Sequence, residues 1–164
     1  MKKVRVPLST AGIEQLEKEL QEYRKWQEAK MKLLTKKLAD LGVDVATMRF
    51  KLTAADADKD ERTVVPVETA NGFIVRATGK TVLFIEFGAG VTYGYGHPEA
   101  NEYGMGPGTY PSDKGHWDDP NGWWVPKSAG GYHTYGNPPA MPMYEARKTI
   151  IRELPRIVKE VFSG

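Results

Sequence analysis

The first third of the chain carries apolar residues at the spacing of an amphipathic helix. Ser9 and Thr10 offer side-chain oxygens that can cap the N-terminus of a helix. Beyond them the apolar positions follow mostly helical spacing, at Ile13, Leu16, Leu20, Tyr23, Trp26, Met31, Leu34, Leu38 and Leu41. The spacing slips over residues 27–30, where a strict heptad would need apolar side chains. We therefore expect one long helix, bent or broken near the slip, that ends at Gly42.

Two shorter patterns flank this helix. Val4, Val6 and Leu8 alternate with polar residues and predict a short leading strand. A second helix is expected to start at Asp44 and to fade over residues 55–58, so that residues 8–58 form a helical N-terminal part. The long helix either packs on the chain's own sheet or pairs with a neighbouring subunit, and the periodicity favours neither.

The next pattern predicts a β-meander over residues 63–88. Strands are expected at 63–69 and 73–78, joined by a tight turn at Asn71-Gly72, with Pro66 placing the first strand at an edge. Residues 81–87 are almost continuously apolar, which is typical of a strand covered on both faces. Glu86 interrupts this run, and a carboxylate there either accepts hydrogen bonds from loop amides or pairs across an interface.

Residues 89–142 have no periodicity and are rich in Gly, Tyr, Trp, His, Pro and Asp. A connection of this length is normally functional or disordered, and its many aromatic residues argue against disorder. We therefore predict an ordered surface insertion that contacts a partner.

The last pattern predicts a C-terminal helix over residues 143–162. Pro142 suits the first helical position, and Pro155 inside the pattern predicts a kink or a break. The apolar residues expected to line one face of this helix are Ala146, Ile150, Ile151, Leu154, Ile157, Val158 and Val161.

These elements predict a single α+β domain over residues 1–164. It comprises a small antiparallel sheet of about three to four strands, packed by the long N-terminal helix and the C-terminal helix, with a long Gly/aromatic loop insertion. Composition is ordinary for a globular protein, with 40% hydrophobic and 27% charged residues and a net charge of +2. The chain has no cysteine, which excludes disulfides and thiol chemistry. It shows neither a secretory signal nor an apolar run long enough to span a membrane, so a soluble protein made in a cytoplasm is expected.

The candidate chemistry is weak. His97, His116 and His133 all lie in the insertion, none at a metal-ligand spacing. Residues 118–122 favour an Asx turn, and residues 56–61 lack the glycine and closing glutamate of a calcium loop. The glycines of 104–108 and the serines of the insertion match no phosphate or nucleophile motif. We predict no catalytic residue, no metal and no cofactor. The insertion also has two lysines against five acidic residues, which disfavours binding to nucleic-acid phosphates.

Four segments of the chain resemble one family of virus proteins. These are Phe84 to Val91 with its Glu-Phe-Gly, Gly106 to Tyr110, Trp117 to Trp123, and Gly136 to Ala146 with its Pro-Ala-Met-Pro. They are similar to the tail-completion, or head–tail joining, proteins of the gene-product-ten-like family of tailed bacteriophages. The resemblance runs from Leu16 to the C-terminus and is strongest from residue 82 on. The chain departs from compact members in its long aromatic insertion.

The resemblance implies a non-enzymatic structural protein of the virion neck, assembled in the cytoplasm of a bacterial host. It implies a homo-oligomeric ring, by analogy a hexamer, that joins the head connector or stopper to a tail-terminator or tail-tube protein, with DNA passing through only as cargo. The residues expected to contact other subunits or partners are Glu86, Phe87, Tyr93, Tyr95, Tyr110, Trp117, Trp123, Trp124, Tyr132, Met141 and Met143.

Two other functions compete with this one. The first is a carbohydrate- or host-surface-binding module that uses the tryptophans and Tyr132 of the insertion; it would need an exposed, flat row of rings. The second is a metal-dependent hydrolase that uses the histidines with Asp118 and Asp119; it would need a bound metal.

Overall fold

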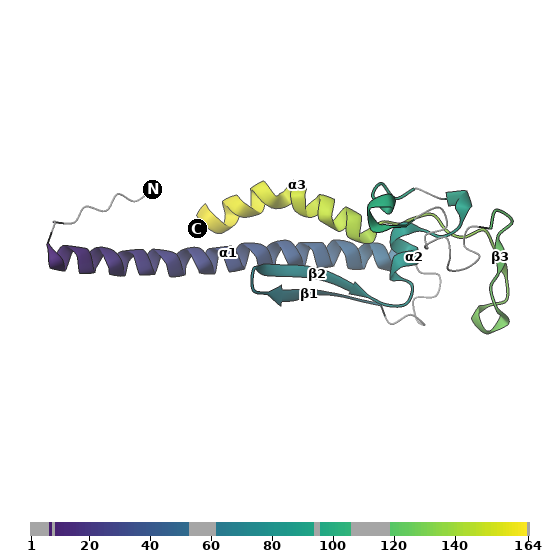
Figure 1. The fold of residues 1–164 in the computed structure, drawn as a ribbon, viewed down its shortest axis with the longest axis horizontal. Coiled ribbons are helices and arrows are strands. Elements are labelled where there is room, and N and C mark those ends of the chain that lie inside the picture. The colour runs from purple at the N-terminus through teal and green to yellow at the C-terminus, as the bar shows by residue number, and fades with distance from the viewer. Residues whose placement is uncertain (1–6, 8, 53–61, 94–95, 106–118, 164) are drawn as a thin grey trace.

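The computed structural model describes residues 7, 9–52, 62–93, 96–105 and 119–163. Over these residues the chain is α+β, with a long N-terminal helix, a C-terminal helix and two antiparallel sheets of two strands each (Figure 1). The elements, in order, are α1 (Thr10–Leu52), β1 (Thr63–Thr69), β2 (Gly72–Thr78), α2 (Val82–Phe87), η2 (Val91–Tyr93), η3 (Ala100–Tyr103), β3 (Trp123–Trp124), η4 (Lys127–Ala129), β4 (His133–Thr134) and α3 (Pro142–Ser163). The predicted leading strand at 4–8 lies largely outside the described residues, and residues 56–61 lie wholly outside them.

α1 is one unbroken helix, so the predicted break at 27–30, the predicted end at Gly42 and the predicted second helix from Asp44 are all wrong. Its start agrees with the sequence, because the Ser9 side-chain oxygen accepts a hydrogen bond from the Gly12 N–H at 3.2 Å. At the slip, Lys30 donates from Nζ to the carbonyl of Val161 at 2.7 Å, so a polar residue at this position still contacts α3.

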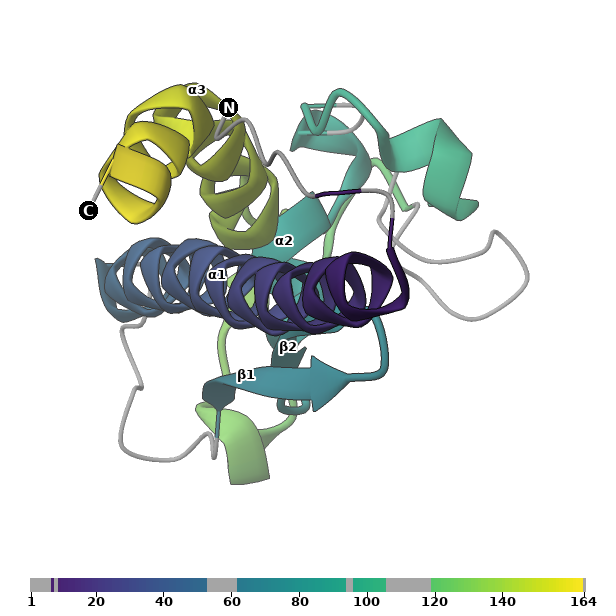
Figure 2. The same ribbon diagram turned by 90° about the vertical axis from the view of Figure 1, so that its left-hand side faces the viewer.

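Gly42 lies inside α1 because two other elements approach the helix there. A Cβ added at Gly42 would lie 2.8 Å from Cδ1 of Ile150 in α3 and 3.0 Å from Cγ2 of Val75 in β2. Figure 2 shows the resulting layers, with α1 between α3 on one side and the β1–β2 hairpin on the other. The glycine therefore serves close packing on both sides, and tertiary contacts offset its low helix propensity.

Two small hydrophobic clusters hold these layers together. One joins Leu34 of α1 to Ile157 and Val161 of α3, near the end of the chain. The other is built around Ala46, Phe50 and Ala146, with partly buried side chains from β1, β2 and α2 packed against it. Both clusters lie against the C-terminal part of α1.

The β1–β2 hairpin matches its prediction. The strands pair antiparallel, Thr69 faces Gly72 across the turn, and Pro66 faces Val75 in a two-stranded sheet whose strands are both edges.

The third predicted strand is wrong, because residues 82–87 form α2 instead. An apolar run this short does not distinguish a strand from a helix by periodicity. The helix places Val82 and Ile85 against the second cluster and turns Leu83 and Phe87 toward a cleft described below.

The insertion at 89–142 contains local structure where it is described. β3 pairs with β4, and an isolated bridge joins Ala89 to Asn137. Asp119 forms the predicted Asx turn: its Oδ1 accepts the N–H of Asn121 at 2.8 Å.

α3 begins at Pro142, as predicted, and continues through Pro155 without a break. The ribbon of α3 curves along its length (Figure 1). The apolar face predicted for α3 is only partly covered: Ala146, Ile157 and Val161 are buried, whereas Ile151 is 63% exposed and Leu154 and Val158 are also exposed. No helix in the described ranges is long and apolar enough to cross a membrane.

Candidate functional site

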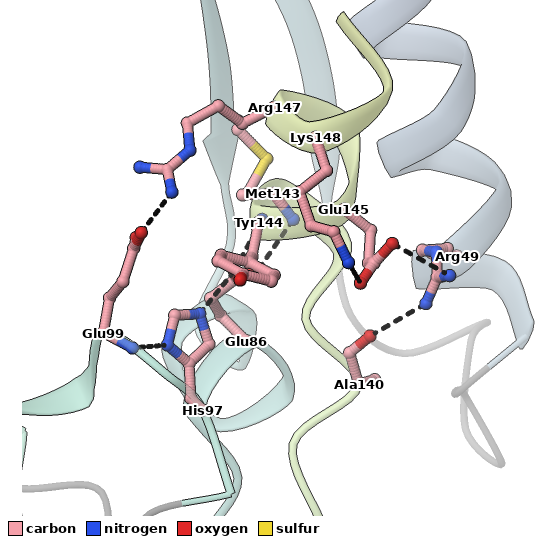
Figure 3. Close-up of polar contacts among 10 residues, drawn as sticks. All are labelled: Arg49, Glu86, His97, Glu99, Ala140, Met143, Tyr144, Glu145, Arg147 and Lys148. Carbon is pink, nitrogen blue, oxygen red and sulfur yellow. Dashed lines mark hydrogen bonds and ion pairs between the residues drawn. The ribbon is translucent and has the colours of Figure 1, made fainter. Parts of the chain in front are cut away.

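The Glu-Phe-Gly and Pro-Ala-Met-Pro segments meet where α2 contacts the start of α3 (Figure 3). Glu86, only 6% exposed, accepts the N–H of Met143 on Oε2 at 2.7 Å and the N–H of Tyr144 on Oε1 at 2.9 Å. Pro142 has no N–H to donate, and the Met141 side chain cannot accept a hydrogen bond strongly. A carboxylate from α2 therefore supplies the N-terminal cap of α3, where negative charge also complements the helix dipole.

His97 completes this junction from the insertion. Its Nδ1 accepts the N–H of Glu99 at 3.1 Å, so the ring proton lies on Nε2, which donates to Oε1 of Glu86 at 3.2 Å. The imidazole lies between two aromatic rings, with centroids 4.5 Å from Phe87 and 5.2 Å from Tyr144, and it is 3% exposed.

Backbone contacts bring the same two motifs close together. The N–H of Ala140 donates to the carbonyl of Ile85 at 2.9 Å. Gly88 has φ +80°, and a Cβ there would lie 2.8 Å from the carbonyl oxygen of Asn137 and from the nitrogen of Pro139. The Glu-Phe-Gly glycine is thus required both by its conformation and by the approach of the Pro-Ala-Met-Pro segment.

Charged residues form the outer rim of this junction. Arg147 pairs with Glu99, and this hydrogen bond raises the pKa of Arg147 further above its already high value. The guanidinium also lies 5.4 Å from the centroid of the Tyr144 ring, a cation–π distance. On the other side of α3, Glu145 pairs with Arg49 of α1 at 3.6 Å and with Lys148 at 3.1 Å.

A cleft of about 630 Å³ opens beside the junction, between β2, α1, α2 and α3. Its walls are mainly apolar, with Phe73 and Val75 from β2, Leu83 from α2 and Ile150 from α3, and Arg147 joins them at the rim.

The polar groups of the junction bond to other groups of the same chain. Both oxygens of Glu86 and both ring nitrogens of His97 have partners within the chain. Acid–base or metal chemistry needs a lone pair or a proton that points at a substrate or an ion. Within the described ranges, no three His, Asp or Glu side chains gather in a way that could hold a metal ion.

The structure gathers some of the predicted contact residues and separates others. Glu86, Phe87, Met141 and Met143 all lie at the α2–α3 junction. Trp123, Trp124 and Tyr132 lie on or beside the separate β3–β4 hairpin, and Tyr93 ends η2. Tyr95, Tyr110 and Trp117 lie outside the described residues, as does His116.

His133 meets two exposed rings at the β3–β4 hairpin edge to face. Trp124 is 72% exposed and meets His133 at an interplanar angle of 68°, and His133 meets Tyr135 at 80°. Neither contact joins two of the rings named for sugar binding, Trp117, Trp123, Trp124 and Tyr132, so the sugar-binding alternative stays a prediction.

Two apolar surfaces lie on the helices and define what we call the α1 stripe and the α3 stripe. The α1 stripe is Ile13, Leu16, Leu20 and Tyr23, on the part of α1 that extends past the end of α3 (Figure 1). The α3 stripe is Ile151, Leu154 and Val158. Leu16 is half-buried, and the other six side chains are exposed.

Sequence reasoning recognised the α1 stripe as a possible subunit contact but missed the α3 stripe. It also missed the contacts of His97 with Glu86 and of Glu99 with Arg147. The signal for the α3 stripe was present, because the apolar residues of α3 cover an arc of about 140°, wider than the stripe of about 100° that is typical of a packed helix.

Comparison with protein-family models, with curated proteins and with solved structures finds no match for this chain.

Proposed function

We propose that the protein is a non-enzymatic assembly subunit of a tailed-bacteriophage neck. In this role, copies of the chain form a ring that completes the tail and joins it to the head connector. The virus assignment rests on the resemblance of the Glu-Phe-Gly and Pro-Ala-Met-Pro segments, and the assembly role rests on the geometry described above.

The observation that carries the assembly role is the apolar surface on the projecting half of α1. With 43 residues, α1 is about 65 Å long at 1.5 Å per residue, and the described β1–β2 hairpin and α3 pack on its C-terminal part. Ile13, Leu20 and Tyr23 are each more than half exposed on the remaining part. A line of large apolar side chains at helical spacing is typical of a surface that another protein covers.

The α2–α3 junction supports the same proposal indirectly. Glu86 accepts the backbone N–H groups of Met143 and Tyr144, and these bonds hold the start of α3 in place. Ala140 donates its N–H to the carbonyl of Ile85, which ties the segment before α3 to α2. The motifs therefore have a physical reason to occur together, which is to build the scaffold that presents the exposed faces of α1 and α3.

The proposal is tested by assembly in solution and in the virus. Light scattering and electron microscopy of the purified protein alone should show rings. With the head connector or the tail-tube protein added, the rings should bind at least one of these two partners. In a phage that lacks this gene, heads and tails should accumulate unjoined, and adding the purified protein should restore joined particles. A protein that stays monomeric and binds to neither particle contradicts the proposal.

A further inference from the structure

We infer that the α1 stripe of one copy binds the α3 stripe of the next copy, head to tail. This inference rests on the proposed function, in which the chain forms a ring, and it names the two surfaces that close that ring.

The α1 stripe continues the surface of α1 that α3 already covers. Leu34 packs on Ile157 and Val161, and it lies about three turns further along the helix than Tyr23, on nearly the same side. The coverage ends with α3 itself: Phe162 meets Trp26 edge to face at 5.9 Å, and Tyr23 stacks on Trp26 at 5.5 Å. The α1 stripe therefore continues the covered surface of α1 toward the N-terminus, past the point where α3 ends.

Acidic residues flank the α1 stripe. Over residues 10–25 the helix carries four glutamates against Lys18, Arg24 and Lys25. By helical geometry Glu19 and Glu22 lie on one side of the stripe, and Glu17, followed two turns later by Arg24, lies on the other. A surface with apolar side chains between carboxylates fits an apolar surface bordered by cations.

The α3 stripe has the matching character. α3 carries five basic and three acidic residues, and Lys148, Arg152 and Lys159 lie on the side of the stripe away from the core. The three acidic residues each already pair with a cation: Glu145 with Arg49 and Lys148, Glu153 with Arg152 and Arg156, and Glu160 with Lys37 and Arg156.

Charge decides which surfaces of two copies meet. Two α1 stripes would place carboxylates against carboxylates, and two α3 stripes would place cations against cations, both of which are repulsive. The unlike pairing is favourable, and each copy carries one surface of each kind. Within one chain the two stripes lie on separate rigid helices, with the α1 stripe beyond the C-terminal end of α3 (Figure 1). The contact is therefore heterologous, the type that closes into rings.

Single cysteines provide a direct test, because the chain has none of its own. Leu20→Cys and Leu154→Cys replace exposed residues, so both variants should fold. Mixed and mildly oxidised, they should give a disulfide-linked dimer that contains one copy of each, at least about tenfold more than either variant alone, since a disulfide forms only when the two Cα atoms approach within about 7 Å. The doubly substituted chain should give a ladder of linked oligomers.

Lys18→Cys is the matched control, because it lies on α1 close to Leu20 but points to the opposite side. Mixed with Leu154→Cys it should link no more than background. Preferential linking of Leu20→Cys to itself, linking within one chain of the double variant, or linking equal to the control would each overturn the inference.

Charge reversal gives an independent measurement. Glu19→Lys with Glu22→Lys in one chain, or Lys148→Glu with Arg152→Glu in another, should each weaken self-association by about tenfold. Mixing the two reversed chains should restore association. The reversed α1 of one chain then faces the reversed α3 of the other, and the unsubstituted α1 faces the unsubstituted α3, so both contacts pair unlike charges. Failure of the mixture to associate would contradict the pairing.

These measurements separate this inference from the proposed function. They use purified protein alone, whereas the function is measured by the joining of heads and tails. A chain that restores virions but does not link through Leu20 and Leu154 would overturn the inference only. A chain that links as expected but joins no particles would overturn the neck assignment only.

Discussion

Glu86 shows how a single residue ties two distant segments together. The cap of α3 comes from a side chain 57 and 58 residues earlier in the chain, because the residue before the helix is a methionine. The positive φ of Met141, 54°, turns the chain into the helix at this point. A left-handed conformation in a residue other than glycine costs about 1–3 kcal/mol. The contacts at the junction, including the capping bonds of Glu86, offset that cost.

We predict that Glu86→Gln lowers the free energy of unfolding by about 1–3 kcal/mol, the usual cost of leaving a buried donor without its acceptor. The substitution places an amide NH₂ against the N–H of Met143 or Tyr144, and the negative charge at the helix N-terminus is lost. Urea unfolding followed by circular dichroism measures the change. Glu102→Gln, at an exposed position in η3, is the control and should shift the midpoint little. Equal stability of the two variants would contradict the capping role.

Gly88 and Gly104 allow two costs of a glycine to be measured separately. Both have positive φ, +80° and +67°, but a Cβ at Gly104 would meet nothing within 4 Å. Gly104→Ala should therefore lower the free energy of unfolding by about 1 kcal/mol, the cost of the left-handed conformation alone. Gly88→Ala should lower it by at least about 1 kcal/mol more than Gly104→Ala does, because backbone atoms of Asn137 and Pro139 must move. The same urea titration compares them, and an equal loss would show that the two motifs do not pack closely.

At the scale of the elements, local sequence signals predicted where helices start and where the hairpin turns. Tertiary contacts determined where α1 ends and whether residues 82–87 form a strand or a helix. Ser9, Asn71 and Pro142 mark a helix start, a hairpin turn and another helix start, since each acts on its own neighbours. Gly42 reads locally as a helix end, yet α1 continues because Ile150 and Val75 approach it from two other elements. Residues 82–87 form a helix for a similar reason, since their partners lie in α1 and α3.

The candidate site follows the same rule. Glu86 and the Pro-Ala-Met-Pro segment were both identified from the sequence, but their contact was not, because the long insertion separates them. The role of His97 was also hidden, since its partner is Glu86 and not one of the nearby carboxylates considered for a metal. The α3 stripe went unrecognised because exposure depends on which side of the helix α1 covers.

The contact between α1 and the C-terminal end of α3 should respond to acid through the pair of Lys37 and Glu160. The hydrogen bond and charge of Lys37 hold the pKa of Glu160 below its ordinary value of 4.5. A carboxyl whose pKa is lower in the folded state stabilises the fold above its unfolded pKa, and this contribution is lost as the pH falls through the folded pKa.

We therefore predict that Glu160→Gln is less stable than the unsubstituted chain at about pH 7. The difference should be lost as the pH falls below about 4.5 and through the lower folded pKa of Glu160, where both chains come to carry a neutral group. The effect should be small, because the pair is exposed to solvent. Urea midpoints from about pH 7 into acid measure the difference, with Glu28→Gln, at an exposed position on α1, as the control. A difference that persists in acid would mean that Glu160 contributes by packing and not by charge.

At the scale of the whole molecule, the shape separates a scaffold from an extension. The described β1–β2 hairpin, α2 and α3 gather on the C-terminal part of α1, and the other part projects beyond the end of α3 (Figure 1). The projecting part has an acidic balance, and α3 has a basic one. A molecule with unlike charges on two separate apolar surfaces favours head-to-tail association over symmetric pairing.

Salt should weaken that association. At an ionic strength of about 1 M the Debye length falls to about 3 Å, compared with about 10 Å at 0.1 M, so the attraction between the glutamates of α1 and the cations of α3 is screened. Light scattering of the unsubstituted protein should show a smaller average mass as salt is raised. Leu20→Ala removes apolar contact area without changing charge. Its average mass should be smaller at every salt concentration and should still fall as salt is raised. An average mass that grows with salt would instead mean that apolar contact dominates and that the flanking charges do not select the partner surface.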